Sequence, residues 1–197
     1  MQSGFFSDSF LYTATTIKRY IPVDTWSYRS NYSDAANVDN SRQEALYQQM
    51  LSRLGPYRGR VDLQVMRMFT TDAALKVPDN SLDFIYVDAR HDYCGVIEDI
   101  EAWWPKLKTG GIMAGDDYFT AAEQLHQKNS IYDPNDDWAI CSDGTKHPGA
   151  VKGAVRHFAT RHGFPVYSTW KHGMKESEKK FWPQWIYPPK KGATLKQ

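Results

Sequence analysis

Apolar and polar positions along the chain alternate between two spacings. In 60–69 (RVDLQVMRMF) every second residue is apolar, and 82–89 (LDFIYVDA) contains a nearly continuous apolar run, so both segments are predicted to be strands. Apolar residues at helical spacing follow each of them and predict helices over 70–77 and 93–107. Strands that alternate with helices indicate an α/β fold, with a mostly parallel sheet covered by helices on both faces.

The rest of the chain adds elements of the same two kinds. A capping box, Ser41-x-x-Glu44, predicts a helix that starts at Ser41 and ends at Gly55-Pro56. Gly110-Gly111 is expected to end the helix that begins near Tyr93. Further predicted elements are a short strand over 21–26 that ends at Asp24, a strand over 111–115, a helix over 150–162 capped by Gly163, and a final strand pair over 164–170 and 181–188.

Residues 118–150 show no clear period. They contain several turn-forming residues, among them Pro134, Gly144 and Pro148. Because connections inside compact domains are seldom this long, we expect the segment to be functional or mobile. The whole chain, 1–197, is expected to form one domain.

Composition narrows the class of protein. The chain has 197 residues, of which 41% are hydrophobic and 14% aromatic, as in soluble globular proteins. Its 24 basic and 23 acidic residues give a formal charge of +1, so no overall attraction to nucleic acid or to a membrane is expected. No apolar run approaches the roughly 18 residues that span a bilayer, and MQSGFFSDSF does not resemble a signal peptide.

The chain has two cysteines, Cys94 and Cys141. They form neither a disulfide framework nor a CxxC metal motif. Two free thiols are typical of a reducing compartment, so the sequence predicts a cytoplasmic protein in which Cys94 serves packing.

Acidic residues end several of the predicted strands. FIYVDARHDY (84–93) ends its apolar run at Asp88, and GIMAGDDY (111–118) ends its run at Asp116 and Asp117. In a parallel sheet these strand ends form one rim, where ligands bind. Carboxylates gathered there repel one another unless they bind a cation, and oxygen ligands favour Mg²⁺, Mn²⁺ or Ca²⁺. His91 lies three residues after Asp88 and could accept a proton near neutral pH.

Each of these residues has a structural interpretation as well. An aspartate at a strand end commonly caps the next helix or orders a turn, and Asp92 is expected to cap the helix that starts near Tyr93. His91 could equally lie in a surface turn. The grouping of Asp88 with the Asp116-Asp117 pair on neighbouring strands favours a metal site over these alternatives.

Together, VDTW (23–26), FIYVDARHDY and WWPKLKTGGIMAGDDY (103–118) resemble class I S-adenosylmethionine-dependent methyltransferases. Within that class, the Asp-x-x-His and Asp-Asp motifs are most similar to the metal-dependent O-methyltransferases of sugars and other small molecules, the macrocin and mycinamicin type. The similarity covers about residues 4–118 well and the following helix and strands more loosely.

The resemblance implies a role for each matched residue. Asp88, Asp116 and Asp117 would bind a divalent metal, with Mg²⁺ the expected ion, and His91 would be the general base. Gly4, Asp24, Trp26, Thr70 and Thr71 would contact S-adenosylmethionine. The segment 118–150 would be the acceptor-binding lid, and the reaction would be direct methyl transfer to a hydroxyl of a small polar acceptor. Apart from the resemblance, exposed strand edges and the abundant tryptophan make self-association of the chain plausible.

The resemblance also marks one difference. The family begins with a strand and a glycine-rich turn, and only the last glycine of that turn, Gly4, is matched here. The expected fold is therefore a Rossmann-like methyltransferase fold without its first strand. Two other functions stay open: a non-catalytic methyltransferase-fold protein that acts as a binding or scaffold module, and a metal-dependent hydrolase. Asp24 and the order of the elements favour the methyltransferase.

Overall fold

The computed structural model describes residues 2–30, 32, 34, 36–127, 138–170, 174 and 182–192. The chain divides into two compact units, Met1–Ala73 and Ala74–Gln197. Each unit has its own strand pairings and its own buried side chains, and the expectation of a single domain stays a prediction.

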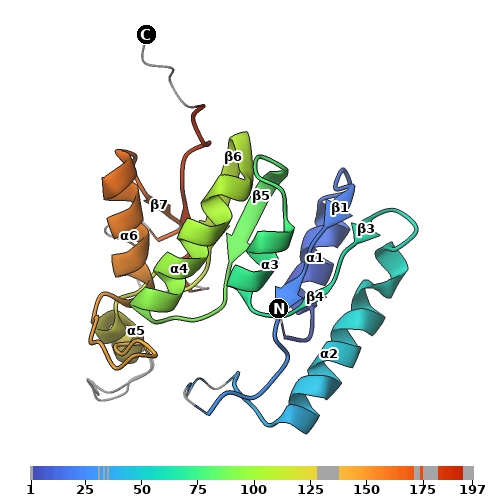
Figure 1. The fold of residues 1–197 in the computed structure, drawn as a ribbon, viewed down its shortest axis with the longest axis horizontal. Helices are drawn as coiled ribbons and strands as arrows, with labels where there is room; N and C mark the ends of the chain where they lie inside the picture. The colour runs from blue at the N-terminus through green and yellow to red at the C-terminus, as the bar shows by residue number, and fades with distance from the viewer. Residues whose placement is uncertain are drawn as a thin grey trace. The chain divides into compact units, whose positions relative to one another are not determined.

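Two short parallel strand pairs form the centre of the first unit (Figure 1). β1 (Arg19–Tyr20) pairs with β3 (Asp62–Leu63), and β2 (Val23–Asp24) pairs with β4 (Met66–Arg67). The helices of this unit are α1 (Phe5–Thr13), α2 (Asn40–Leu54), a 3-10 turn over Gly55–Tyr57, and the first residues of α3 (Thr70–Lys76). The strands predicted over 21–26 and 60–69 are therefore present, and the second is divided into β3 and β4.

The start of α2 differs from the prediction by one residue. Asp39, and not Ser41, is the N-cap, since its carboxylate accepts a hydrogen bond from the backbone N–H of Arg42 at 2.9 Å. The Ser41 hydroxyl donates to the same carboxylate oxygen at 2.5 Å. The aspartate is favoured because a charged acceptor also interacts with the positive end of the helix dipole.

The core of the first unit joins α1 and α2 to the strands. Leu11 from α1 packs with Met50 and Leu54 from α2, together with Trp26 and Val61. Gly4 precedes α1 at a left-handed φ of 76°, and a Cβ on it would lie 2.9 Å from Cγ of Met50. Only glycine fits this position without strain.

The second unit is built on a four-stranded mixed sheet in the order β5-β6-β8-β7 (Figure 1). β5 and β6 are parallel, whereas β8 is antiparallel to both of its neighbours, β6 and β7. Its elements are β5 (Leu82–Val87), α4 (Tyr93–Trp103), a 3-10 turn over Trp104–Lys106, β6 (Leu107–Gly115), α5 (Ala121–Gln127), α6 (Ala150–His162), β7 (Tyr167–Ser168) and β8 (Trp185–Ile186).

Most predictions for this unit are confirmed, with two corrections. Gly110-Gly111 lies inside β6 and does not end a helix, because the strand already begins at Leu107. Residues 118–150 are not without regular structure, since they contain α5; residues 128–137 of that segment lie outside the described residues. The final strand pair is confirmed as β7 and β8, and α6 has the predicted bounds.

α4 and α6 lie side by side against the sheet (Figure 1). The ring of Trp104 meets those of Phe158 and Tyr187 edge to face, at 5.4 and 5.9 Å between centroids. Arg161 of α6 pairs with Glu101 of α4 at 2.7 Å. Among the described residues, no helix has both the length and the apolar character needed to cross a membrane.

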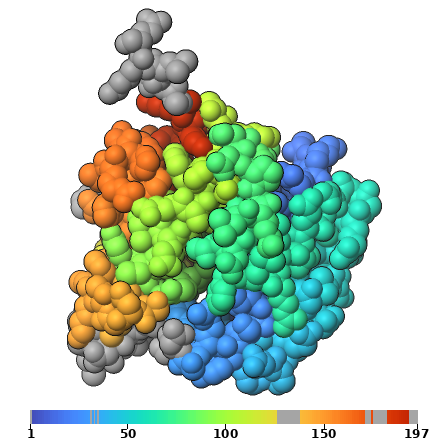
Figure 2. All heavy atoms as spheres, in the orientation of Figure 1, coloured from blue at the N-terminus to red at the C-terminus, as the bar shows by residue number. Residues whose placement is uncertain are grey.

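The prediction of two free thiols is wrong. Cys94, in the first turn of α4, forms a disulfide with Cys141, with 5.5 Å between their Cα atoms. Cys141 belongs to the segment 138–149, which lies at the surface beside α4 (Figure 2). The two cysteines are 47 residues apart, and the fold brings them within bonding distance. The prediction that Cys94 serves only packing is therefore also wrong, since its sulfur is bonded to that of Cys141.

Candidate active site

β5 and β6 place the candidate acids at one edge of the sheet of the second unit. The strands are parallel, and Val87 lies opposite Gly115. Asp88 and Asp116 follow these two residues directly, so both lie just beyond the carboxyl ends of adjacent strands. The backbone N–H of Asp116 donates to the carbonyl of Val87 at 3.2 Å, which holds the two strand ends together. The expected convergence of these acids is present.

His91 lies between two of the carboxylates. Its Nε2 atom is 3.1 Å from Oδ2 of Asp117 and 4.0 Å from Oδ1 of Asp88. The potential ligand atoms of these three residues all lie within 4.8 Å of one another. Asp117 reaches this position from a left-handed backbone with φ of 58°, which is uncommon for a residue other than glycine and is typical of functional sites.

Asp116 has a different environment from the other two acids. One oxygen of its carboxylate accepts a hydrogen bond from the backbone N–H of Asp117 at 2.9 Å. Burial, with the negative charges of Asp117 and Asp88, raises the pKa of Asp116 to about 6. Burial and the same carboxylates raise the pKa of the Tyr86 hydroxyl. The cluster therefore holds more negative charge than its surroundings stabilise.

These residues fit a divalent cation. Carboxylate oxygens and one imidazole nitrogen are suitable ligands for Mg²⁺ or Mn²⁺, and a cation would offset the repulsion that raises the pKa of Asp116. The compact ligand group consists of Asp88, His91 and Asp117. The assignment of Asp116 as a ligand and of His91 as the base stays a prediction.

A small pocket opens beside the cluster. Its lining includes Asp88, His91, Asp116 and the indole of Trp185 from β8. The Trp185 side chain is buried, and its indole N–H has no hydrogen-bond partner among the residues that the structure describes. Gly115 lets this ring approach, since a Cβ there would lie 2.6 Å from Cε2 of the indole. The indole ring of Trp185 thus forms one wall of the pocket beside the carboxylates.

An aromatic ring covers His91. Trp138 is 2% exposed and stacks on the imidazole, with 4.7 Å between ring centroids and 30° between ring planes. Trp138 also meets Trp182 edge to face at 6.2 Å. Neither Trp138 nor Trp185 is predicted as a site residue from the sequence, because no spacing or motif links them to His91.

The residues assigned to the cofactor all belong to the first unit. Asp24 ends β2, and its carboxylate accepts hydrogen bonds from the backbone N–H groups of Trp26, at 3.0 Å, and of Gln2, at 3.1 Å. Thr70 and Thr71 begin α3, shortly after β4, the parallel partner of β2. Asp24 and these threonines therefore follow the carboxyl ends of paired strands. The Trp26 ring lies in the core of this unit.

A second group of ligand-type side chains consists of Cys94, Cys141 and His147. Both sulfur atoms are used in the disulfide, so this group offers no thiolate to a metal. The imidazole of His147 stacks instead on the ring of Tyr93, at 4.2 Å between centroids.

Residues 2–118 match the model of a family described as a methyltransferase domain, which covers more than half of the chain. The chain belongs to this methyltransferase family. A comparison with curated protein sequences finds no match.

Solved structures of similar fold agree with the family. An O-methyltransferase family protein from Burkholderia thailandensis superposes with a TM-score of 0.56 at 13% identity, over 97% of this chain and 49% of that one. Cofactor-bound Rv0187 from MTB gives 0.53 at 12% identity, over 95% and 81%. The calicheamicin methyltransferase CalS11 gives 0.51 at 14% identity, over 93% and 66%. At these identities the likeness establishes the Rossmann-like methyltransferase fold.

Proposed function

We propose that this methyltransferase transfers a methyl group from S-adenosylmethionine to a hydroxyl of a small polar acceptor, with help from a divalent cation such as Mg²⁺. The observation that carries the proposal is the position of His91, with Nε2 at 3.1 Å from Asp117, at the carboxyl ends of β5 and β6. This is the edge at which ligands bind in open α/β sheets. The methyltransferase family and the O-methyltransferase neighbour support methyl transfer to an oxygen atom.

The first unit supplies the residues for the methyl donor. When bound, S-adenosylmethionine supplies an electrophilic methyl group on a sulfonium centre. The Asp24 carboxylate accepts backbone hydrogen bonds from Gln2 and Trp26, and a carboxylate at this strand end would also accept hydrogen bonds from ribose hydroxyls of the donor. Gly4, with its left-handed φ, would allow the backbone before α1 to approach the donor closely, and Thr70 and Thr71 would lie near its adenine.

His91 is the general base for the acceptor hydroxyl. A divalent cation held by Asp88, Asp116 and Asp117, and not by Nε2 of His91, would supply Lewis-acid assistance that lowers the pKa of the hydroxyl. His91 takes the hydroxyl proton on Nε2, and Asp117 at 3.1 Å stabilises the imidazolium that results. Trp138 stacks on the imidazole and restricts the orientation of its plane. The remaining contribution of the protein is to align the reactants and exclude water.

The test is transfer of labelled methyl groups from S-adenosylmethionine to a panel of hydroxylated small molecules. We expect a chelator to abolish transfer and Mg²⁺ to restore it. Asp117→Asn and His91→Gln should each lower the rate by about 100-fold or more, the usual contribution of a general base and its partner. Asp83→Asn is the matched control, because it removes an exposed carboxylate that pairs with Lys108 at the surface, away from the candidate site.

Two results would contradict the proposal. Methyl transfer that a chelator does not affect would contradict the role of the divalent cation. A chain that does not bind S-adenosylmethionine in calorimetric titration, with or without Mg²⁺, would favour a non-catalytic binding module.

A further inference from the structure

We propose that the Cys94–Cys141 disulfide is a redox switch for the candidate site: the closed bond holds Trp138 on His91, and reduction releases it. The proposal rests on the proposed function, in which His91 is the base. It concerns the second unit alone, which contains all four residues.

The disulfide and the aromatic stack join the same two segments of the chain. Cys94 follows His91 by three residues, and Cys141 follows Trp138 by three residues. One segment leads from β5 into α4, and the other is the surface segment 138–149. The disulfide and the ring stack therefore restrain each other. Opening the disulfide removes the covalent restraint that lies nearest to the stack of Trp138 on His91.

The segment 138–149 has several contacts that do not depend on the disulfide. At its far end, the Pro148 carbonyl accepts a hydrogen bond from Ala121 at 3.0 Å, and His147 stacks on Tyr93. Between the ends, the segment bonds mainly to itself: the N–H of Cys141 donates to Thr145, and that of His147 to Ala139, both at 2.8 Å. These contacts persist when the disulfide opens, so we expect local release of residues 138–141 and not unfolding of the segment.

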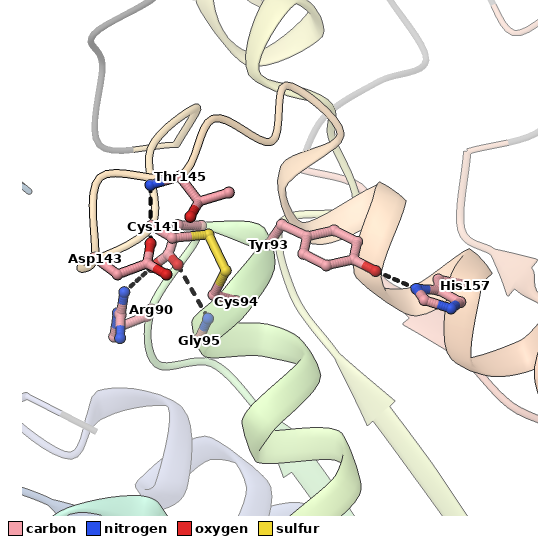
Figure 3. The surroundings of a disulfide bond; sticks show 9 residues. Arg90, Tyr93, Cys94, Gly95, Cys141, Asp143, Thr145 and His157 are labelled. Carbon is pink, nitrogen blue, oxygen red and sulfur yellow. Dashed lines mark hydrogen bonds and ion pairs between the residues drawn. A yellow bond between two sulfur atoms is a disulfide. The ribbon is translucent and has the colours of Figure 1, made fainter.

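The surroundings of Cys94 suit a reducible bond (Figure 3). Cys94 is partly exposed and lies in the first turn of α4, a helix of 11 residues, where the helix dipole favours a thiolate. Asp92 caps this turn by accepting from the N–H of Gly95 at 3.0 Å and pairs with Arg90 at 2.7 Å. Cys94 is therefore the cysteine that an external thiol reaches more readily, since Cys141 is only 3% exposed.

The switching reaction is thiol–disulfide exchange with an external dithiol. A thiolate of the dithiol attacks one sulfur of the bond, and the other cysteine leaves as a thiolate and takes up a proton. The second thiol of the reductant then displaces the first protein cysteine and closes the reductant's own disulfide. Two electrons and two protons pass to Cys94 and Cys141, and the dithiol is oxidised.

The first experiment reads the stack directly by NMR of the histidine rings, in the presence of a chelator that keeps metals from the reduced cysteines. In the oxidised chain, the Trp138 ring current should shift the ring protons of His91 upfield. On addition of dithiothreitol these signals should move to the position that they take in Trp138→Leu. His162, which packs on Phe158 in α6, is an internal control whose signals should stay fixed.

A thiol-free variant separates the switch from side effects of the reductant. Cys94→Ser/Cys141→Ser should show the reduced position of the His91 signals with and without dithiothreitol. His91 signals that are unchanged on reduction of the native chain would overturn the proposal. Alkylation of both cysteines in the folded chain after air oxidation, without any reductant, would overturn it as well.

A kinetic experiment links the switch to methyl transfer. Reduction should raise the KM for the best acceptor of the panel several-fold and leave the KM for S-adenosylmethionine unchanged, and Trp138→Phe should restore part of the difference that Trp138→Leu produces. Equal acceptor KM values in the two redox states would overturn the switch. An oxidised chain without any transfer would refute the proposed function, while the NMR measurement would still decide whether the disulfide holds Trp138 on His91.

Discussion

The raised pKa of Asp116 ties the stability of the second unit to pH. Because its pKa in the folded chain is about 6 and the ordinary value is 3.8, the folded state binds a proton more tightly than the unfolded chain. The stability that results is fully present below pH 3.8 and is lost as the pH rises through 6. Asp116→Asn mimics the protonated form at every pH, so without metal the variant should be more stable than the native chain above pH 6.

The expected gain is modest. One pKa unit corresponds to about 1.4 kcal/mol, and partial exposure of this carboxyl to water reduces the effect to about 1 kcal/mol. Urea denaturation at pH 4 and pH 7.5 in a chelator measures the difference, which should be seen only at the higher pH. Asp83→Asn, an exposed carboxylate, should show no such dependence. Equal stabilities of Asp116→Asn and the native chain at both pH values would refute the prediction.

The surroundings of Gly115 leave no room for a side chain. A Cβ there would lie 2.4 Å from the carbonyl oxygen of Val87 and 2.6 Å from the indole of Trp185. Gly115→Ala should therefore destabilise the second unit by about 1–3 kcal/mol, as overpacking usually does. It should also impair methyl transfer, because Asp116 follows directly. Gly59→Ala is the control, since nothing lies within 4 Å of its Cβ. A Gly115→Ala chain as stable as this control would contradict the prediction.

The residues of the site divide into those that a sequence can indicate and those that it cannot. Asp88, Asp116 and Asp117 are predictable because parallel strands end at one edge, and the apolar runs show where the strands end. Trp138 and Trp185 are not predictable in this way. Their roles depend on a stack across 47 residues and on a strand pairing with Gly115, and neither leaves a local pattern.

At the scale of elements, two helices of the chain offer a matched comparison of capping. Asp39 caps α2 at the surface, and Asp92 caps α4 at a position that is only 1% exposed. Asp39→Ala should cost about 1 kcal/mol, the usual value for an N-cap. Asp92→Ala should cost about 3 kcal/mol, because it also leaves Arg90 without its ion-pair partner at a half-buried position. Thermal unfolding of both variants tests this order, and equal losses would show that burial of the cap does not matter.

The elements that the sequence predicts well are those with a complete apolar stripe, such as α4 and α6. α5 is missed because its residues, AAEQLHQ, show no clear apolar period. A local signal was present nonetheless. Thr120 and Glu123 form a capping box, in which the N–H of Glu123 donates to the Thr120 hydroxyl at 3.2 Å and the N–H of Thr120 to the Glu123 carboxylate at 2.9 Å. This capping box indicates the start of α5, which the spacing of apolar residues does not.

At the scale of the whole molecule, the disulfide could not be predicted from amino-acid composition. Two cysteines without a characteristic spacing suggest free thiols, since small disulfide-rich proteins usually carry more. Whether two particular cysteines pair depends on the separation and direction of their Cα–Cβ bonds, which only the folded chain sets. Here α4 and the segment 138–149 bring the two Cα atoms to 5.5 Å. The final strand pair, β7 and β8, in contrast, is predicted from its local apolar runs.

The disulfide should also contribute to global stability. It joins positions 47 residues apart, and closing a loop of that length restricts the unfolded chain enough to stabilise the fold by about 2–4 kcal/mol. Reduction of the native chain should therefore lower the urea midpoint, with the largest local loss of hydrogen-exchange protection in residues 138–141. The chain with Cys94→Ser and Cys141→Ser should unfold at the midpoint of the reduced protein and should not respond to the reductant. An unchanged midpoint on reduction would mean that the stacks of Trp138 and Tyr93 hold these segments together without the bond, and the redox switch would then lack its physical basis.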